Sequence, residues 1–300
     1  MSEDTRLIKV SNVGLALSIV EFATYPFSLA LAILVVVKIV RSALLPSVIR
    51  ALLCLTLLRV PSTIVRRVYI LSMRVFVYGE SVIPLQEINT RLHFFAWFII
   101  SVCGVSFSLQ LIISSFNTTL ARKWKNLRAT FTVAGIIIVI SVSFAFIRIP
   151  HSIIYSEIVA LTTSIMVLAF IFIANHKWRK TRVQDELSAK ATWEENMRSI
   201  RIIAPLLIHE NIFHLANLAA IQLQIWLSPN QRATLNYDPS IFNNIFGLLL
   251  ASEVLITPAL LLFCLNRMNE RQKILQTLIE RRNASDDGQR YFQQLLSSWN

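Results

Sequence analysis

Residues 241–265 read IFNNIFGLLLASEVLITPALLLFCL, a run of 25 residues in which Glu253 is the single charged side chain. About 20 mostly apolar residues are enough for a helix to cross the roughly 30 Å hydrocarbon core of a bilayer. A helix is the expected structure, because lipid cannot hydrogen-bond to exposed backbone groups. Six further apolar runs precede this one. Together they predict an all-α membrane protein, a bundle of seven transmembrane helices at residues 15–37, 43–65, 92–116, 129–146, 153–174, 202–227 and 241–265.

The basic residues predict the orientation of this bundle. With the N-terminus outside and the C-terminus inside, 19 of the 29 Lys and Arg residues fall on inner segments and eight on outer segments. This distribution follows the positive-inside rule. The remaining two, Arg50 and Arg59, lie within the second span and make it the weakest of the seven. Without that span the count falls to six.

The composition leaves little material for a soluble domain, since 55% of the residues are apolar and 15% are charged. The net charge of +12 is read as an insertion signal and as an attraction to anionic lipid of the inner leaflet. The lipid bilayer, and no nucleic acid, is therefore the expected partner. We expect a transmembrane domain at 1–265 and an amphipathic cytoplasmic tail at 266–300, with its helix broken at Asn283-Ala-Ser-Asp-Asp-Gly.

The sequence lacks the motifs of the common enzyme classes, including a Walker loop, a GxSxG elbow and an HExxH pair. No enzyme activity, cofactor or metal site is predicted, and His209 and His214 are five residues apart, on different helix faces. Three cysteines cannot build a disulfide framework, and Cys54 and Cys103 lie inside spans. Cys264, at the inner end of the last span, is either a buried thiol or a palmitoylation site.

Ionisable side chains within the spans are informative, because each costs at least about 2.5 kcal/mol in lipid unless it is paired or wet. Counted along the helices, Arg50 lies at a depth similar to those of Glu210 and Glu253, which predicts an ion pair among them. Glu21 and Arg59 lie nearer the outer face and form a second predicted pair. The first pair is either a switch that breaks on activation or a static support, whereas the second is assigned a mainly structural role.

Polar and aromatic side chains suggest where a ligand binds. Glu210, His214 and Asn217 follow i, i+4, i+7 spacing, so they share one helix face and should point into the bundle. Trp97 and Asn244 lie in the outer halves of the third and seventh spans. Pockets between helices, mostly apolar with few polar groups, suit small organic ligands. The ligand-binding candidates are Trp97, His214, Asn217 and Asn244, and the alternative is that they are interface anchors or packing residues.

The loop after the third span carries Arg122, Lys123 and Lys125 in a compact basic cluster. In the predicted orientation this loop faces the cell interior. It would meet an intracellular protein partner there, or it serves only to determine topology.

The inner segment before the sixth span contains Leu187-Ser-Ala-Lys and Glu195-Asn-Met-Arg-Ser-Ile-Arg, and the chain ends with Tyr291-Phe-Gln-Gln-Leu-Leu-Ser-Ser-Trp-Asn. With the seven-span layout, these runs resemble the serpentine chemoreceptors of nematodes, most nearly the Sre class. The resemblance implies a chemosensory G protein-coupled receptor in the plasma membrane of chemosensory neurons. It further implies that the receptor binds a small-molecule cue and signals to a heterotrimeric G protein.

Two positions depart from the wider rhodopsin-like pattern. That pattern has an acidic residue before the arginine that ends helix three and an Asn-Pro motif in helix seven, whereas this chain has Ala121-Arg122 and Thr257-Pro258. Pro258 still permits a kink in the last span. Without an acidic partner beside Arg122, the usual lock at the inner side is not predicted.

Two other functions remain open. A ligand-gated ion channel of the invertebrate gustatory type has seven helices but the opposite orientation, which the basic residues disfavour. A secondary transporter is the third reading, kept by the charged residues Arg50, Glu210 and Glu253, although no inverted repeat is evident.

Overall fold

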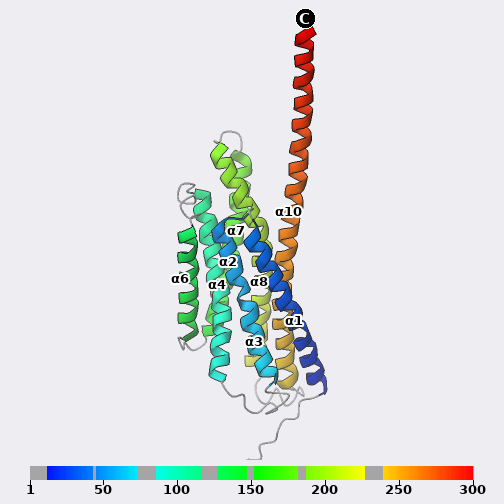
Figure 1. The fold of residues 1–300 in the computed structure, drawn as a ribbon. Helices are drawn as coiled ribbons and strands as arrows, with labels where there is room; N and C mark the ends of the chain where they lie inside the picture. Colours follow the sequence, from blue (N-terminus) through cyan, green and yellow to red (C-terminus); the bar gives the residue numbers. More distant parts are fainter. Residues whose placement is uncertain are drawn as a thin grey trace, which may run out of the picture. The chain divides into compact units, whose positions relative to one another are not determined.

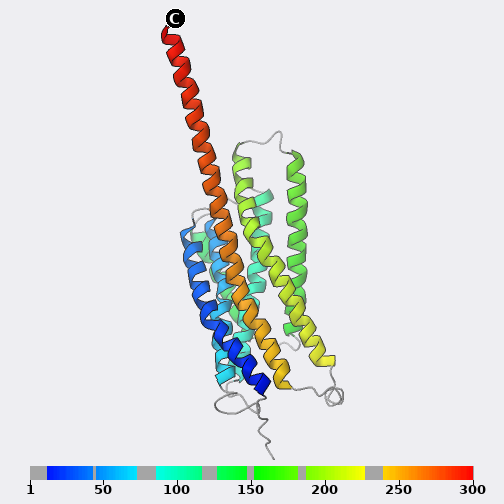
Figure 2. The same cartoon turned by 90° about the vertical axis from the view of Figure 1, so that its right-hand side faces the viewer.

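All regular structure in the described part of the chain is helical, as predicted (Figures 1 and 2). The computed structural model describes residues 12–42, 45–72, 86–116, 127–146, 152–181, 187–226 and 239–299. Its helices are α1 (Asn12–Arg41), α2 (Ser47–Leu57), α3 (Arg59–Ser72), α4 (Gln86–Phe116), α6 (Leu127–Phe146), α7 (Ser152–Thr181), α8 (Leu187–Trp226) and α10 (Pro239–Trp299).

Four segments within the described ranges are long and apolar enough to cross a membrane: Asn12–Arg41, Ser47–Ser72, Met197–Ala220 and Asn244–Ile274. Shorter apolar segments lie in α4, α6 and α7, at Phe94–Phe107, Arg128–Ser143 and Leu161–Phe170. The chain therefore has the helices of a membrane protein. The weakest prediction, the second span at 43–65, overlaps one of the four long segments, Ser47–Ser72.

The chain divides into two compact units, Met1–Leu261, here called the bundle, and Leu262–Asn300. In the second unit α10 continues without interruption to Trp299. The predicted break beginning at Asn283 is therefore wrong. Asn, Ser, Asp and Gly are weak helix formers, but each costs at most about 1 kcal/mol relative to Ala, and no proline lies in this stretch to force an end.

The second span consists of two helices that meet at Leu58, whose backbone N–H donates to the carbonyl of Leu55 at 3.0 Å. The cause lies at Pro61, which has no N–H to donate to the carbonyl of Leu57 and whose ring crowds that carbonyl. α2 therefore ends at Leu57. Pro61 falls in the first turn of α3, where the missing donor is tolerated, and α3 then runs to Ser72, seven residues beyond the predicted end.

α4 lies at the centre of the bundle, where it contacts α2, α3, α6, α7 and α8. Its buried side chains include Ala96, Ile99, Cys103 and Phe107. They recur every three or four residues, so they form one stripe along the helix. In Figures 1 and 2 the helices of the bundle lie side by side with their long axes roughly aligned.

α1 packs through a stripe of mostly small or polar residues. Small side chains let membrane helices approach closely, and a strict alternation of three and four residues is the spacing of coiled-coil packing. The buried positions of α1 are Gly14, Ser18, Glu21, Tyr25, Ser28, Ala32, Val35 and Ile39.

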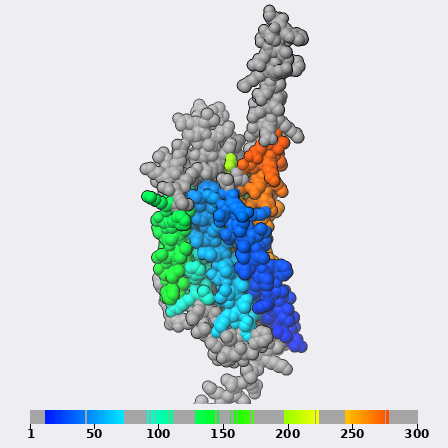
Figure 3. Space-filling model, viewed as in Figure 1, coloured from blue at the N-terminus to red at the C-terminus, as the bar shows by residue number. Residues whose placement is uncertain are grey.

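The outer surface of the bundle is apolar. Phe27 on α1, Phe131 on α6 and Phe172 on α7 are each at least 69% exposed. Figure 3 shows α1, α2, α3 and α6 side by side on one face. Exposed phenylalanines on helices of this length match a hydrocarbon environment rather than water.

Candidate functional site

Arg59 of α3 holds two carboxylates from two other helices. Its Nη1 donates to Glu210 Oε2 of α8 at 3.0 Å, and its Nη2 forms an ion pair with Glu253 Oε1 of α10. The three side chains are at most 5% exposed. We call Arg59, Glu210 and Glu253 the central cluster, since it joins α3, α8 and α10.

The central cluster contains one more carboxylate than guanidinium. Glu210 Oε1 and Glu253 Oε2 accept no hydrogen bond from any residue that the structure describes. The Nδ1 atom of His209 lies 3.9 Å from Glu210 Oε1. Removing one member of a buried ion pair typically costs about 3–5 kcal/mol, so the arrangement is sensitive to any change in its charge.

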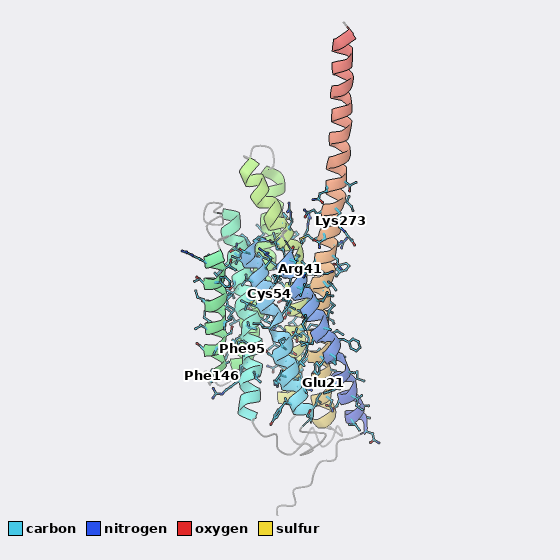
Figure 4. All side chains as sticks on the ribbon, in the orientation of Figure 1. Glu21, Arg41, Cys54, Phe95, Phe146 and Lys273 are labelled. Carbon is cyan, nitrogen blue, oxygen red and sulfur yellow. The ribbon has the colours of Figure 1, made fainter. Side chains whose placement is uncertain are left out.

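Glu21 and Arg67 form a second cluster, between α1 and α3. Arg67 Nε donates to Glu21 Oε1 at 2.6 Å, and Arg67 Nη2 donates to Oε2 at 2.7 Å. This two-bond geometry is the strong form of an arginine–carboxylate pair. The hydroxyl of Tyr25 donates to the same Oε1, and Glu21 is fully buried. Figure 4 labels Glu21 among the side chains of the bundle. We call Glu21, Tyr25 and Arg67 the α1–α3 cluster.

Gly247 of α10 has no side chain, and the α1–α3 cluster occupies the space where one would lie. A Cβ atom built on Gly247 would overlap Arg67 Nη2 and Glu21 Oε2, and would lie 2.8 Å from Arg67 Cζ. A side chain at this position would thus displace the ion pair. In the sequence this residue is simply the one glycine of the last predicted span. Its importance becomes clear only when the structure places Glu21 and Arg67 beside it.

A third polar contact joins α1 to α10. Asn244 Nδ2 donates to the carbonyl of Gly14 at 3.2 Å, and Ser18 Oγ donates to Asn244 Oδ1 at 3.2 Å. Both atoms of the amide are therefore engaged within the protein. Asn244 was a ligand-binding candidate, and the contacts give it a role in helix packing.

The predicted partner of the central carboxylates is wrong. Arg59, rather than Arg50, contacts Glu210 and Glu253. The Nη1 atom of Arg50 instead donates to the carbonyl of Val40 at 3.0 Å, and Arg50 is half-buried.

The predicted pair of Glu21 with Arg59 is also wrong, because Glu21 pairs with Arg67. The sequence places the second span at 43–65, whereas the apolar helical segment is Ser47–Ser72. This displacement moves Arg59 inward to the central carboxylates and brings Arg67 level with Glu21. The prediction from sequence counted Arg67 as an outer charge, and only a continuation of the helix beyond residue 65 would have included it.

The polar face of α8 is buried as predicted, with Glu210, His214 and Asn217 at most 4% exposed. Neither atom of the Asn217 amide has a hydrogen-bond partner among the described residues. Most buried polar groups are paired with protein or water, so this amide is placed to bind a water molecule or a ligand. Asn211, six residues earlier on α8, also has an unpartnered buried Oδ1 within the described part of the chain.

The structure describes less of the other candidate residues. Trp97 lies on α4, but its side chain falls outside the described part of the chain, as do Arg122, Lys123 and Lys125. The three cysteines are free, with Cys103 buried and Cys264 half-buried. Within the described ranges, no three His, Cys, Asp or Glu side chains come together to hold a metal ion.

Comparison with known proteins does not identify the family of this chain. No protein-family model matches the chain, and no curated protein matches its sequence significantly. The resemblance to nematode chemoreceptors therefore stays a prediction, and the clusters described above must be interpreted on their own chemistry.

Proposed function

We propose that this chain is a seven-helix chemosensory receptor of the plasma membrane, with its N-terminus outside. It binds a small-molecule cue within the bundle and signals to a heterotrimeric G protein in chemosensory neurons. The observation that supports this best is the central cluster, in which one buried arginine ties α3 to both α8 and α10. The resemblance to the Sre class supplies the G protein and the cell type.

The physical argument rests on differential affinity. A ligand changes the population of two helix arrangements only if it binds one of them more tightly. In the central cluster, Arg59 holds one carboxylate from each of two helices, so moving either helix changes the ion pairing. The unpartnered amide of Asn217, two turns along α8 from Glu210, offers a ligand a polar contact near this cluster. No bond needs to form or break.

The first test concerns orientation. The chain would be expressed in eukaryotic cells with Asn283 intact or as Asn283→Gln, and separately with a glycosylation sequon added at the N-terminus. Inner-side placement predicts that Asn283 stays unmodified while the added sequon is glycosylated, as read by gel mobility with and without glycosidase. Glycosylation of Asn283 would refute the receptor orientation and favour the channel reading.

The second test concerns signalling. Cells that express the chain with each of several G proteins, carrying energy-transfer reporters on the α and βγ subunits, would be exposed to a panel of small organic compounds. The proposal predicts that at least one compound dissociates a G protein, and that the Asn217→Leu variant, expressed equally at the surface, responds less. Arg50→Gln, which leaves both buried clusters intact, is the matched control.

A transporter is the second candidate, because the central cluster contains a carboxylate in excess of its guanidinium. A proton or a cationic substrate would balance that charge, and such intramembrane carboxylates mark ion pathways in many carriers. Ion-coupled uptake into vesicles containing the purified chain, lost in Glu253→Gln, would support this reading. Absence of uptake together with G protein activation would exclude it.

A further inference from the structure

A cavity of about 280 Å³, open on one side, lies between α1 and α3. Its lining is almost entirely apolar. The main lining residues are Leu15, Ile19, Phe22 and Ala23 of α1 and Leu71 and Ser72 of α3.

The cavity adjoins the part of α1 that faces hydrocarbon. Ile19 and Phe22, which line it, are 61% and 50% exposed. On a helix that crosses a membrane, exposed side chains of this kind contact lipid. A molecule dissolved in the bilayer can therefore reach the cavity laterally, without crossing a polar surface.

The volume limits the size of the occupant. A cavity of about 150 Å³ lined by Leu, Ile and Phe side chains binds benzene. The cavity between α1 and α3 is roughly twice as large, so it suits a compound of about a dozen non-hydrogen atoms. Its apolar lining offers little to a charged or strongly polar compound.

Two lining residues connect the cavity to α10. Ser18 also lines it and donates a hydrogen bond to Asn244. Leu71 packs in a buried group with Tyr25 and Ala251, and Tyr25 in turn donates to Glu21. An occupant that shifts Ser18 or Leu71 thereby acts on contacts that hold α1, α3 and α10 together.

We propose that this cavity is a binding site for a small, uncharged, apolar molecule that enters from the bilayer. This site is separate from the ligand contact proposed at Asn217, and for its signalling consequence, though not for binding itself, it rests on the proposed function. The polar candidates around Asn217 lie elsewhere in the bundle, so the two sites can be tested separately.

The test uses the full chain, purified in phosphatidylcholine nanodiscs, and the photoreactive probe trifluoromethylphenyldiazirine. After illumination, labelled residues are mapped by mass spectrometry at increasing probe concentrations, with and without excess trifluoromethylbenzene. We expect saturable labelling within 15–23 and at 71–72, suppressed by the competitor. Labelling that rises linearly along all exposed residues of α1 would overturn the proposal.

Two variants separate the cavity from the surrounding lipid surface. Ala23→Phe inserts a ring into the cavity and should reduce saturable labelling about tenfold or more, the ratio of labelling affinities being the measured quantity. Ala30→Phe makes the same change at another exposed position of the same helix, one that does not line the cavity, and should leave labelling unchanged. Equal labelling of both variants, each shown to be folded by its elution from a size-exclusion column, would refute the assignment.

The outcome is distinct from that of the signalling test. Saturable labelling without any G protein response would retain the site and reject the receptor. A G protein response that Ala23→Phe leaves intact, without saturable labelling, would retain the receptor and reject this site. Protection of 15–23 by added phospholipid but not by trifluoromethylbenzene would assign the cavity to a lipid chain and would also overturn the proposal.

Discussion

Gly247→Ala is expected to destabilise the protein by displacing the ion pair of Glu21 with Arg67. The added methyl group would occupy the position of Arg67 Nη2 and approach Arg67 Cζ to 2.8 Å. Arg67 is the end of a flexible side chain, but it is buried and held by two hydrogen bonds to Glu21. It cannot move away without losing at least the bond from Nη2 to Oε2.

Three contributions set the size of the effect. Loss of one hydrogen bond between charged groups costs about 1.5–3 kcal/mol, and overpacking adds about 1–3 kcal/mol. Replacing glycine by alanine within a helix returns about 1 kcal/mol. The net loss is about 1.5–5 kcal/mol, equivalent to a fall in Tm of roughly 3–20 °C at about 2–4 °C per kcal/mol for a large domain.

The chain contains its own control. A Cβ atom on Gly135 of α6 would meet no atom within 4 Å among the described residues, so Gly135→Ala should leave stability unchanged or raise it by up to about 1 kcal/mol. Thermal unfolding in detergent can be followed with a thiol-reactive fluorophore, because the buried Cys103 becomes accessible on unfolding.

A variant that lacks the ion pair tests whether displacement of the ion pair causes the destabilisation by Gly247→Ala. In the double variant Glu21→Gln, Arg67→Met the two charges are removed together, which leaves no unpaired buried charge. There the cost of Gly247→Ala should fall by more than 1 kcal/mol, a coupling that a double-mutant cycle measures directly. The reasoning is refuted if Gly247→Ala and Gly135→Ala have the same Tm, or if the cost of Gly247→Ala is unchanged in this background.

Three further predictions follow from the polar residues. Arg59→Gln leaves two buried carboxylates without their cation and should cost about 3–5 kcal/mol, whereas Arg50→Gln should cost about 1 kcal/mol; equal shifts in Tm would contradict the ion pairs described here. Asn217→Leu removes an unpartnered buried amide and should raise stability by about 1–3 kcal/mol in the ligand-free protein, so a lower Tm would mean that the amide is already hydrogen-bonded. Asn283 should show no glycosidase-sensitive shift in gel mobility, and its modification would reverse the proposed orientation.

The helical fold was predictable because it depends on long apolar runs, and the described part of each predicted span lies on helices, apart from residues 45, 46 and 58 of the second span. The α1–α3 cluster was only half predictable. Glu21 stood out as a charge in an apolar run, but Arg67 was assigned to an outer loop. The end of a span cannot be read from hydropathy when a helix continues through arginines whose partners lie on other helices.

Backbone detail was harder to predict than burial. Pro61 in a predicted span signals a disturbance, but whether the helix kinks, ends or restarts depends on its neighbours. Pro258, in contrast, lies inside the unbroken α10. The face of Glu210, His214 and Asn217 was predictable, since spacing alone places them together.

The interruption at Leu58 has a mechanical consequence. α3 begins at Arg59 and extends for 14 residues, about 21 Å, to the lining of the apolar cavity at Leu71 and Ser72. If α3 tilts by about 5° about Leu58, its far end at Leu71 and Ser72 moves by about 2 Å over that length, whereas Arg59, next to Leu58, stays almost in place. A small molecule bound against Leu71 would therefore shift the far half of α3, which includes Arg67 and its pair with Glu21, more than the central cluster.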